Sequence, residues 1–336
     1  KLESKNKTLQ EVLAGNVSAK VIEDKSSIAY LKLLENFVDL YVNSHLKDDV
    51  EYEGMKICSA DEIKRYLNKS VFSTDKGYAE KANQYMKILI KKVKDNSDNL
   101  THDVWLKYRE EYLGLPKNSP RRKEILEEVD KIQKEIKKGC PTSIKNYFKF
   151  MKVNPIIIYQ AFLENLNVLV QDNHNILKEI QDYTLSRISK KQIGFEDLSP
   201  LLLINYCLNG IKDFKDFSYL VIDEAQDLSL AQYYVLKKLF PSAKFNVFGD
   251  VNQSIYDYQS IHDWDELNNV IFDNKASMLD LNKSYRTTVN ISDASNLILN
   301  HLGQNNSECV ARMGDEVVTN DDISEVTLIS QIKSLL

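Results

Sequence analysis

Residues 219–227 read Tyr-Leu-Val-Ile-Asp-Glu-Ala-Gln-Asp, an apolar run of strand length that ends in carboxylates. Tyr219 to Ile222 predict a short buried strand, and Asp223 and Glu224 follow where such a strand leaves the core. This is a Walker B arrangement, in which one carboxylate holds Mg²⁺ and a second lies near the attacking water. A strand followed by a helix N-terminus explains two adjacent acids equally well, because the helix dipole favours negative charge there.

Two further strand ends carry polar residues. An apolar run at 245–248 leads into Gly-Asp-Val-Asn-Gln-Ser-Ile-Tyr at 249–256. A third strand is predicted at 277–281, shortly before Ser-Tyr-Arg-Thr-Thr at 284–288. Open α/β sheets bind ligands at the carboxyl ends of their strands. Three strand ends would thus carry two acids, Gln253 and Arg286. This set of side chains suits phosphoryl transfer.

At these residues the chain resembles the UvrD-like superfamily 1 helicases. The stretches at 223–227, 249–256 and 284–288 resemble motifs II, III and IV of that family, in the family's order. The flanking sequence is closer still to the HelD group, helicase-like ATPases that act on bacterial RNA polymerase. The segments that carry this closer resemblance are 25–27, 196–202, 239–241 and 281–286. The motif-level resemblance covers residues 196–300 well and the first 190 residues loosely.

The resemblance implies a role for each motif residue. Asp223 would be a Mg²⁺ ligand through water, and Glu224 the general base that orients and deprotonates the attacking water. Gln253 would contact the γ-phosphate of ATP, and Arg286 would reach it as an arginine finger. The resemblance thus implies ATP and Mg²⁺ as cofactors. It implies DNA, single-stranded or duplex, as partner, and RNA polymerase as a further partner in the HelD group.

Tyr258 is the residue that the resemblance implies for nucleic-acid contact. Many relatives carry a tryptophan there that stacks on a DNA base, and such stacking contributes about 1 to 3 kcal/mol per base. Tyr258 keeps an aromatic ring, so we expect it to contact nucleic acid. The sequence then departs from the family, since Gln-Ser-Ile at 259–261 replaces the usual Arg-Gly-Ala.

The phosphate-binding loop of the family is absent from the sequence. No Gly-x-x-x-x-Gly-Lys-Ser/Thr occurs, and the nearest stretch, at 15–20, lacks the second glycine and the hydroxyl residue. Motifs V and VI are also missing. We therefore expect an internal fragment of a longer protein. Because that loop supplies the N–H groups and lysine that hold the phosphates, the fragment alone should bind ATP weakly and hydrolyse it negligibly.

Composition indicates a helix-rich globular protein. Of 336 residues 43% are hydrophobic, and ten glycines and six prolines are few. The four cysteines are Cys58, Cys140, Cys207 and Cys309. They are scattered and form no Cys-x-x-Cys pair, which is typical of buried thiols in a reducing compartment. We find no signal peptide or membrane-spanning stretch, so we expect a cytoplasmic protein without a membrane partner.

The charges are distributed unevenly. Residues 61–152 hold 22 Lys and Arg against 14 Asp and Glu, a balance of +8 in a chain of net charge -5. Helices are predicted at 77–95, 101–113, 119–138 and 142–152. The third begins at Ser119-Pro120 and is expected to end at Gly139 and Pro141. It carries an apolar stripe formed by Ile125, Val129, Ile132 and Ile136. The basic surface is either a solvated helical face or a contact surface for nucleic acid or an acidic partner such as RNA polymerase.

The predicted fold class is α/β: an incomplete RecA-like P-loop NTPase domain with a parallel sheet and a large, mostly α-helical inserted domain. Residues 1–190 would form the inserted domain, with a β-like patch at 50–58. Residues 191–283 would form the C-terminal part of the first RecA-like ATPase domain, and 284–336 the start of the second.

Three functions are open at this point. The chain could belong to an ATP-dependent DNA helicase or translocase. It could instead belong to a HelD-like ATPase that remodels or recycles RNA polymerase without true unwinding, or be an interaction module that has lost catalysis. Because Asp223, Glu224, Gln253 and Arg286 are all present, the sequence argues against the third.

Overall fold

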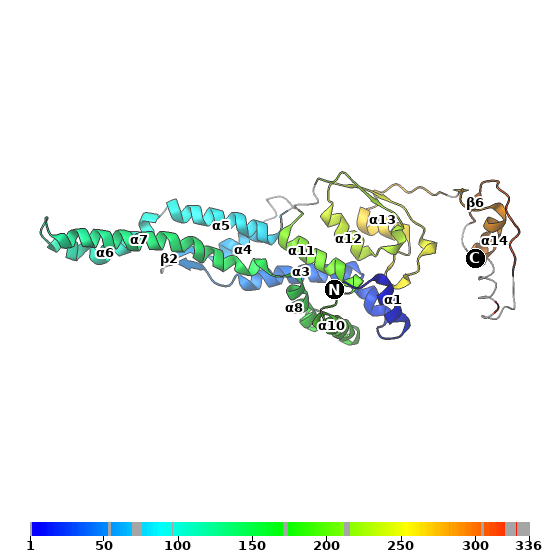
Figure 1. The fold of residues 1–336 in the computed structure, drawn as a ribbon, viewed down its shortest axis with the longest axis horizontal. Helices are drawn as coiled ribbons and strands as arrows, with labels where there is room; N and C mark the ends of the chain where they lie inside the picture. The colour runs from blue at the N-terminus through cyan, green and yellow to red at the C-terminus, as the bar shows by residue number, and fades with distance from the viewer. Residues whose placement is uncertain are drawn as a thin grey trace. The chain divides into compact units, whose positions relative to one another are not determined.

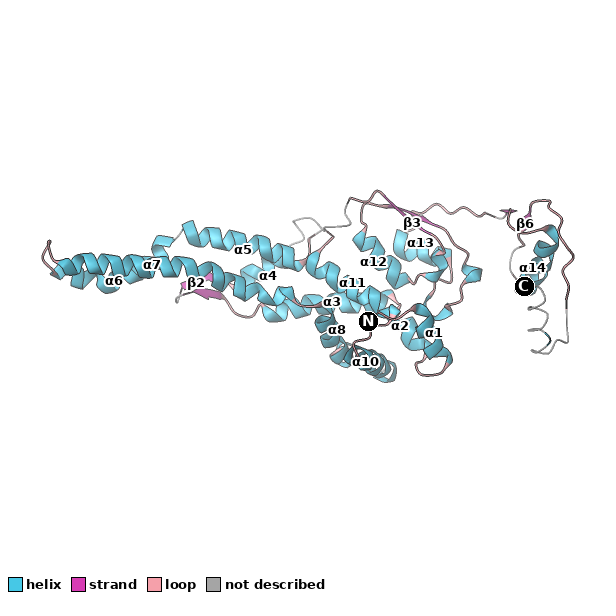
Figure 2. Cartoon of the chain, viewed as in Figure 1, coloured by secondary structure: helices cyan, strands magenta, loops and turns pink. Residues whose placement is uncertain are grey.

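The computed structural model describes residues 2–52, 55–68, 76–95, 97–170, 174–211, 216–281, 283–303, 306–319 and 327. The chain divides into two compact units, Lys1–Asn274 and Lys275–Leu336. Within the described ranges helices dominate, and the strands are short (Figures 1 and 2). Each unit carries one two-stranded parallel sheet.

The first unit is built around α11 (Leu198–Asn209), whose sequence is apolar round most of its circumference, as expected of a buried helix. Leu203, Ile204 and Leu208 of this helix are at most 1% exposed. It contacts α3 (Ile28–His45), α5 (Tyr78–Asp95), α8 (Pro155–Glu164) and α12 (Leu230–Leu239). α11 therefore packs against helices that lie far apart in the sequence of this unit.

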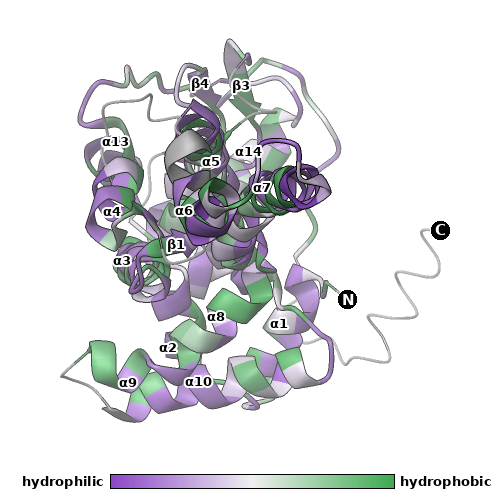
Figure 3. Ribbon diagram, turned by 90° about the vertical axis from the view of Figure 1, so that its left-hand side faces the viewer, coloured by the Kyte–Doolittle hydropathy of each residue, from purple (hydrophilic) through white to green (hydrophobic). Residues whose placement is uncertain are grey.

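The first unit also contains α1 (Lys5–Leu13), α2 (Ala19–Lys25), α9 (Leu166–Leu169) and α10 (His174–Ser189). Ser18 and Ser27 cap α2 and α3, accepting hydrogen bonds from the N–H groups of Val21 and Tyr30. α8 is largely apolar, as its green colour shows in Figure 3, and it packs against α3, α10 and α11. These contacts bury the largest apolar cluster of the chain.

A helical arm extends from this body. It contains β1 (Val50–Tyr52), β2 (Met55–Cys58), α4 (Ala60–Asn68), α5, α6 (Ser97–Gly114), α7 (Pro120–Tyr147) and the 3₁₀ helix η1 (Phe148–Lys152). β1 and β2 pair antiparallel, which confirms the predicted β-like patch. Ser119 is the N-cap and Pro120 the first residue of α7, as predicted. Ile125 and Val129 are buried against α6, and Ile132 and Ile136 pack beside them, so the predicted apolar stripe is confirmed.

The predicted end of this helix at Gly139 and Pro141 is wrong, since α7 continues through both to Tyr147. A proline inside a helix costs about 3 kcal/mol, because it removes a hydrogen bond and crowds the preceding turn. Burial of Cys140 and Ile144, each 0% exposed, offsets this cost in the turns around it. Gly139 permits close packing, because a Cβ there would lie 2.1 Å from the Tyr52 hydroxyl oxygen.

The sheet of the first unit consists of β3 (Tyr219–Ile222) and β4 (Lys244–Val247), connected through α12. The strands are parallel and in register, with Tyr219 opposite Lys244 and Ile222 opposite Val247. α12 and α13 (Trp264–Phe272) contribute the cluster that covers one face. The prediction that β3 is buried is wrong, since Tyr219 and Val221 are 62% and 66% exposed on the other face.

The predicted strand at 277–281 is wrong, since these residues, all within the described ranges, form no regular secondary structure. Leu279 and Leu281 are 89% and 87% exposed. The strand nearby is β5 (Lys283–Ser284), which pairs parallel with β6 (Glu308–Cys309) in the second unit. That unit also holds α14 (Val289–His301). An apolar run of strand length does not by itself make a strand, because a strand also needs a neighbour that pairs with its N–H and C=O groups.

None of the helices within the described ranges combines the length and the apolar content that a bilayer crossing requires.

Candidate functional site at the ends of β3 and β4

The chain turns sharply where β3 ends. Glu224 has φ 49° and ψ 42°, the left-handed conformation that costs an ordinary L-residue about 1 to 2 kcal/mol. The 3₁₀ helix η3 (Ala225–Asp227) follows directly. Asp223 and Glu224 are both exposed, and the main-chain N–H of Glu224 donates to Asp223 Oδ1 at 3.0 Å. The turn therefore presents both carboxylates to solvent.

The chain after β4 forms a second turn with its own polar contacts. Asp250 is the N-cap of the 3₁₀ helix η4 (Val251–Gln253), and its Oδ1 accepts a hydrogen bond from Asn252 N at 3.0 Å. Asp250 Oδ2 accepts from Gln253 Nε2 at 2.9 Å. Gln253 itself is exposed. Its amide is thus held against this turn while it faces solvent.

The two turns are bonded to each other. Ala225 N donates to Phe248 O at 2.9 Å, and Phe248 N donates to Ile222 O at 2.8 Å. Parallel strands end at the same sheet edge, and this pairing carries the register one residue beyond β4. The structure therefore brings Asp223, Glu224 and Gln253 together at one edge.

Gln226 joins the two turns through its side chain, and the sequence reasoning missed it. Its Nε2 donates to Glu224 Oε2 at 2.8 Å, and its Oε1 accepts from Asp250 N at 3.1 Å. The signal was its place in the Asp-Glu-Ala-Gln-Asp stretch, two residues after Glu224. Its own role depends on a contact to the second turn, 24 residues away.

Arg286 lies in the second compact unit, just after β5, and its side chain is exposed. Its main-chain carbonyl accepts a hydrogen bond from Arg312 Nη2 at 2.7 Å. The three residues at the edge of β3 and β4 belong to the first unit. Two strand ends of the first unit, not three, therefore supply site residues within one compact body.

Tyr258 is half-buried in the 3₁₀ helix η5 (Asp257–Gln259) and packs against the largest apolar cluster. Its hydroxyl is enclosed and has no hydrogen-bond partner in the described part of the chain. Burial, with smaller effects from Tyr256 and Glu196, raises the pKa of Tyr258 to about 12. The ring thus packs inward in this structure, and stacking on a base would require its side chain to turn out.

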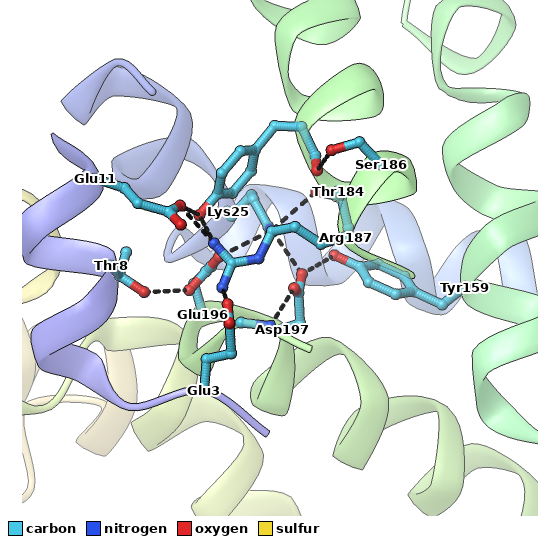
Figure 4. A network of polar contacts seen from close by, with 12 residues as sticks. Glu3, Thr8, Glu11, Lys25, Tyr159, Thr184, Ser186, Arg187, Glu196 and Asp197 are labelled. Carbon is cyan, nitrogen blue, oxygen red and sulfur yellow. Dashed lines mark hydrogen bonds and ion pairs between the residues drawn. The ribbon is translucent and has the colours of Figure 1, made fainter. Parts of the chain in front are cut away.

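A buried polar network connects α1, α2, α10 and the chain at Glu196 and Asp197 (Figure 4). Lys25 is 0% exposed, and its Nζ lies 2.6 Å from Asp197 Oδ1 and 3.7 Å from Glu196 Oε1. Lys25 Nζ also donates to Thr184 Oγ1 at 3.0 Å. Burial raises the pKa of the Asp197 carboxyl even though Lys25 acts in the opposite direction. Two segments singled out in the sequence, 25–27 and 196–202, thus meet in one ion pair.

The same network ties α1 to the body. Thr8 Oγ1 donates to Glu196 Oε2 at 3.1 Å, and Arg187 pairs with Glu3 and with Glu11, the latter at 2.7 Å. α1 also touches the motif region, since Lys5 Nζ donates to the Asp227 carbonyl oxygen and lies 4.0 Å from the centroid of the Tyr256 ring. The N-terminal helix therefore contacts both the buried network and the chain around the two turns.

Comparison with known protein families decides the identity of this region. A family model described as the UvrD/REP helicase N-terminal domain matches residues 55–262, more than half of the chain. The chain belongs to this family. Membership implies a RecA-like α/β fold, and the parallel β3–α12–β4 unit is the part of such a fold described above. It also supports the resemblance to UvrD-like superfamily 1 helicases.

Individual relatives are similar over parts of their length. The ATP-dependent DNA helicase PcrA of Leuconostoc citreum is 34% identical over 115 residues, 33% of this chain and 14% of the relative. The ATP-dependent DNA helicase Rep of Buchnera aphidicola subsp. Schizaphis graminum is 32% identical over 135 residues, 37% of this chain and 20% of the relative. The Rep helicase of Buchnera aphidicola subsp. Acyrthosiphon pisum is 33% identical over 146 residues, 40% and 22% respectively. The chain thus spans 14% to 22% of the length of these relatives.

Proposed function

We propose that this chain is part of an ATP-dependent superfamily 1 DNA helicase or translocase, which hydrolyses ATP with Mg²⁺ to move along nucleic acid. The observation that carries the proposal is the placement of Asp223, Glu224 and Gln253 at one edge of a parallel strand pair. The relatives named as ATP-dependent DNA helicases support it.

Asp223 is the proposed Mg²⁺ ligand. Mg²⁺ keeps several waters and is bound through one or two carboxylates together with substrate phosphates. The exposed carboxylate of Asp223 fits this mode, because its Oδ1 accepts one main-chain hydrogen bond and, among the described residues, its Oδ2 accepts none. The ion would supply charge neutralisation at the phosphates of ATP.

Glu224 is the proposed general base and Gln253 the proposed γ-phosphate contact. Gln226 engages Glu224 Oε2, which leaves Oε1 to accept the proton of an attacking water. Gln253 uses one of its two amide N–H groups on Asp250, so the second can donate to a phosphate oxygen. Both side chains face solvent, where a nucleotide could reach them.

Arg286 is the proposed arginine finger and Tyr258 the proposed contact to nucleic acid. An arginine finger raises the rate of related phosphoryl transfers by roughly 10³ to 10⁵. The exposed guanidinium of Arg286 supports that role. Base stacking by Tyr258 would require the ring to leave its present contacts with the apolar cluster.

A HelD-like ATPase that remodels RNA polymerase is the second candidate. The observation that favours it is the buried ion pair between Lys25 and Asp197, because it joins two of the segments that carry the resemblance to the HelD group. Under this candidate the ATP chemistry is the same, and the partner differs. DNA-stimulated ATP hydrolysis with strand separation supports the helicase, whereas co-purification with polymerase without unwinding supports the remodeller.

The test of the ATPase proposal is Glu224→Gln in the full-length protein. We expect kcat to fall by at least roughly 100-fold, because the base is removed, while ATP binding is retained. Glu164→Gln, the same change at an exposed residue that ends α8, is the matched control and should turn over like wild type. Steady-state phosphate release and equilibrium nucleotide binding measure the two effects. Unchanged turnover in Glu224→Gln refutes the assignment of the base.

A further inference from the structure

Gln226 is a buried amide beside an exposed carboxylate. It is 3% exposed, and both ends of its amide are bonded to residues at the edge of β3 and β4. The partners fix the orientation of the amide, because a carboxylate can only accept from Nε2 and a main-chain N–H can only donate to Oε1. Turning the amide over would place oxygen against oxygen and N–H against N–H.

The turn after β4 passes close to the amide of Gln226 at Gly249. A Cβ on Gly249 would lie 2.4 Å from Gln226 Oε1 and 2.9 Å from Ala225 N. Only glycine therefore permits the turn after β4 to pass this close to the turn after β3. The glycine of the Gly-Asp stretch is thus explained by the side chain of Gln226.

The bonds continue beyond Gln226. Asp250 offers its main-chain N–H to Gln226 and its carboxylate to Gln253, at 3.1 and 2.9 Å. A continuous chain of hydrogen bonds therefore runs from Glu224 through Gln226 and Asp250 to Gln253. Its first member stands in a strained left-handed conformation, and such strain persists at functional sites when surrounding contacts determine it.

We propose that Gln226 is a positioning residue that orients the Glu224 carboxylate and couples it, through Asp250, to Gln253. This inference rests on the proposed ATPase function of the same site. Because Gln226 engages one oxygen of Glu224, it holds the other toward the water that is to be deprotonated. Because the same amide holds Asp250, a displacement of Gln253 on loss of the γ-phosphate is transmitted to the base.

The experiment is Gln226→Glu in the full-length protein. The new carboxylate still accepts from Asp250 N, but it cannot donate to Glu224 and repels it. We expect kcat for ATP to fall by roughly 10- to 100-fold, as when a group that orients a functional side chain is removed, with KM within about threefold of wild type. We also expect the acidic limb of the kcat pH profile to move upward by about one pH unit, because two adjacent carboxylates hold a proton more tightly.

Gln10→Glu, the same substitution at an exposed position of α1, is the matched control and should leave kcat and its pH profile unchanged. Asp250→Ala is a second variant that breaks the chain at an exposed residue while its main-chain N–H remains for Gln226. It should also lower kcat by about tenfold with ATP affinity retained.

The outcomes separate the two proposals. Loss of turnover in Glu224→Gln together with a normal kcat and pH profile in Gln226→Glu overturns the positioning role and leaves the ATPase intact. Turnover that survives Glu224→Gln overturns the ATPase assignment itself. If Gln226→Glu does not fold, the result for Asp250→Ala decides: a wild-type kcat refutes the coupling, and a reduced kcat with unchanged ATP binding supports it.

Discussion

Replacement of Lys25 by methionine tests the buried network that joins α2 to α11. The ammonium is 0% exposed and lies 2.6 Å from Asp197 and 3.7 Å from Glu196. Methionine keeps most of the unbranched stem and removes the charge, so the substitution opens little cavity. The carboxylates of Glu196 and Asp197 would then remain buried without this cation. They would keep only their contacts to other groups.

The size of the effect follows from that geometry. Two opposite charges 4 Å apart attract by about 4 kcal/mol at an effective dielectric constant of 20, and this pair is closer. Removing one partner of a buried ion pair costs about 3 to 5 kcal/mol, because the remaining charge is uncompensated. We therefore expect Lys25→Met to lower the free energy of unfolding by about 3 to 5 kcal/mol.

Urea unfolding followed by far-ultraviolet circular dichroism measures this change. With a slope near the upper end of about 1 to 3 kcal/mol per molar urea, as expected for a chain of this length, the midpoint should fall by roughly 1 to 2 M. Lys20→Met is the matched control on the same helix, because the Lys20 side chain is 57% exposed and pairs with Glu23 and Asp24 on the surface. It should cost less than about 1 kcal/mol. Equal midpoints for the two variants would show that the ammonium of Lys25 is not held in a buried pair.

Two further predictions concern packing and pH. Gly77→Ala should destabilise the protein by about 1 to 3 kcal/mol, since the new Cβ would lie 2.4 Å from main-chain atoms of Leu208. The control is Gly114→Ala, whose new Cβ meets nothing within 4 Å and which should be neutral or stabilising. Thermal melts of the two variants and wild type measure both effects. Burial lowers the pKa of Lys5 to about 8, against the opposing charge of Asp227. Between pH 8 and the ordinary lysine pKa of 10.5 the unfolded chain therefore binds more protons at this residue than the folded chain. The contribution of Lys5 to the free energy of unfolding therefore increases as the pH rises. The unfolding free energy of wild type relative to Lys5→Met should rise between about pH 7.5 and 10 in urea titrations, and a flat or falling difference would contradict the burial of the ammonium.

Local sequence signals predicted the elements that need no distant partner. Ser119-Pro120 marks the start of α7, and the Ser229 hydroxyl and the Gln232 side chain form a capping box that starts α12. The spacing of Ile125 and Val129 predicted the buried face of α7. Caps and helical periodicity act within one or two turns, so the sequence alone contains the information.

Signals that depend on a partner failed or were missed. The apolar run at 277–281 forms no strand in the described part of the chain, and Leu279 and Leu281 stay exposed. The exposed face of β3 could not be predicted, because apolar strands look alike whether one or both faces are covered. Gly139 and Pro141 signal a helix end, yet burial of the next turn outweighs the local penalty.

The sequence by itself determined which functional side chains are present and in what order. It gives two acids after one strand, a glutamine after the next, and the order of three motifs. Only the tertiary structure decided that Gln226 connects the first two, that Gly249 must lack a side chain, and that Lys25 meets Asp197. The physical reason is the separation along the sequence between the residues that interact. Residue type and spacing specify which groups exist and how nearby backbone folds, whereas hydrogen bonds and ion pairs between distant segments depend on packing that no local pattern records.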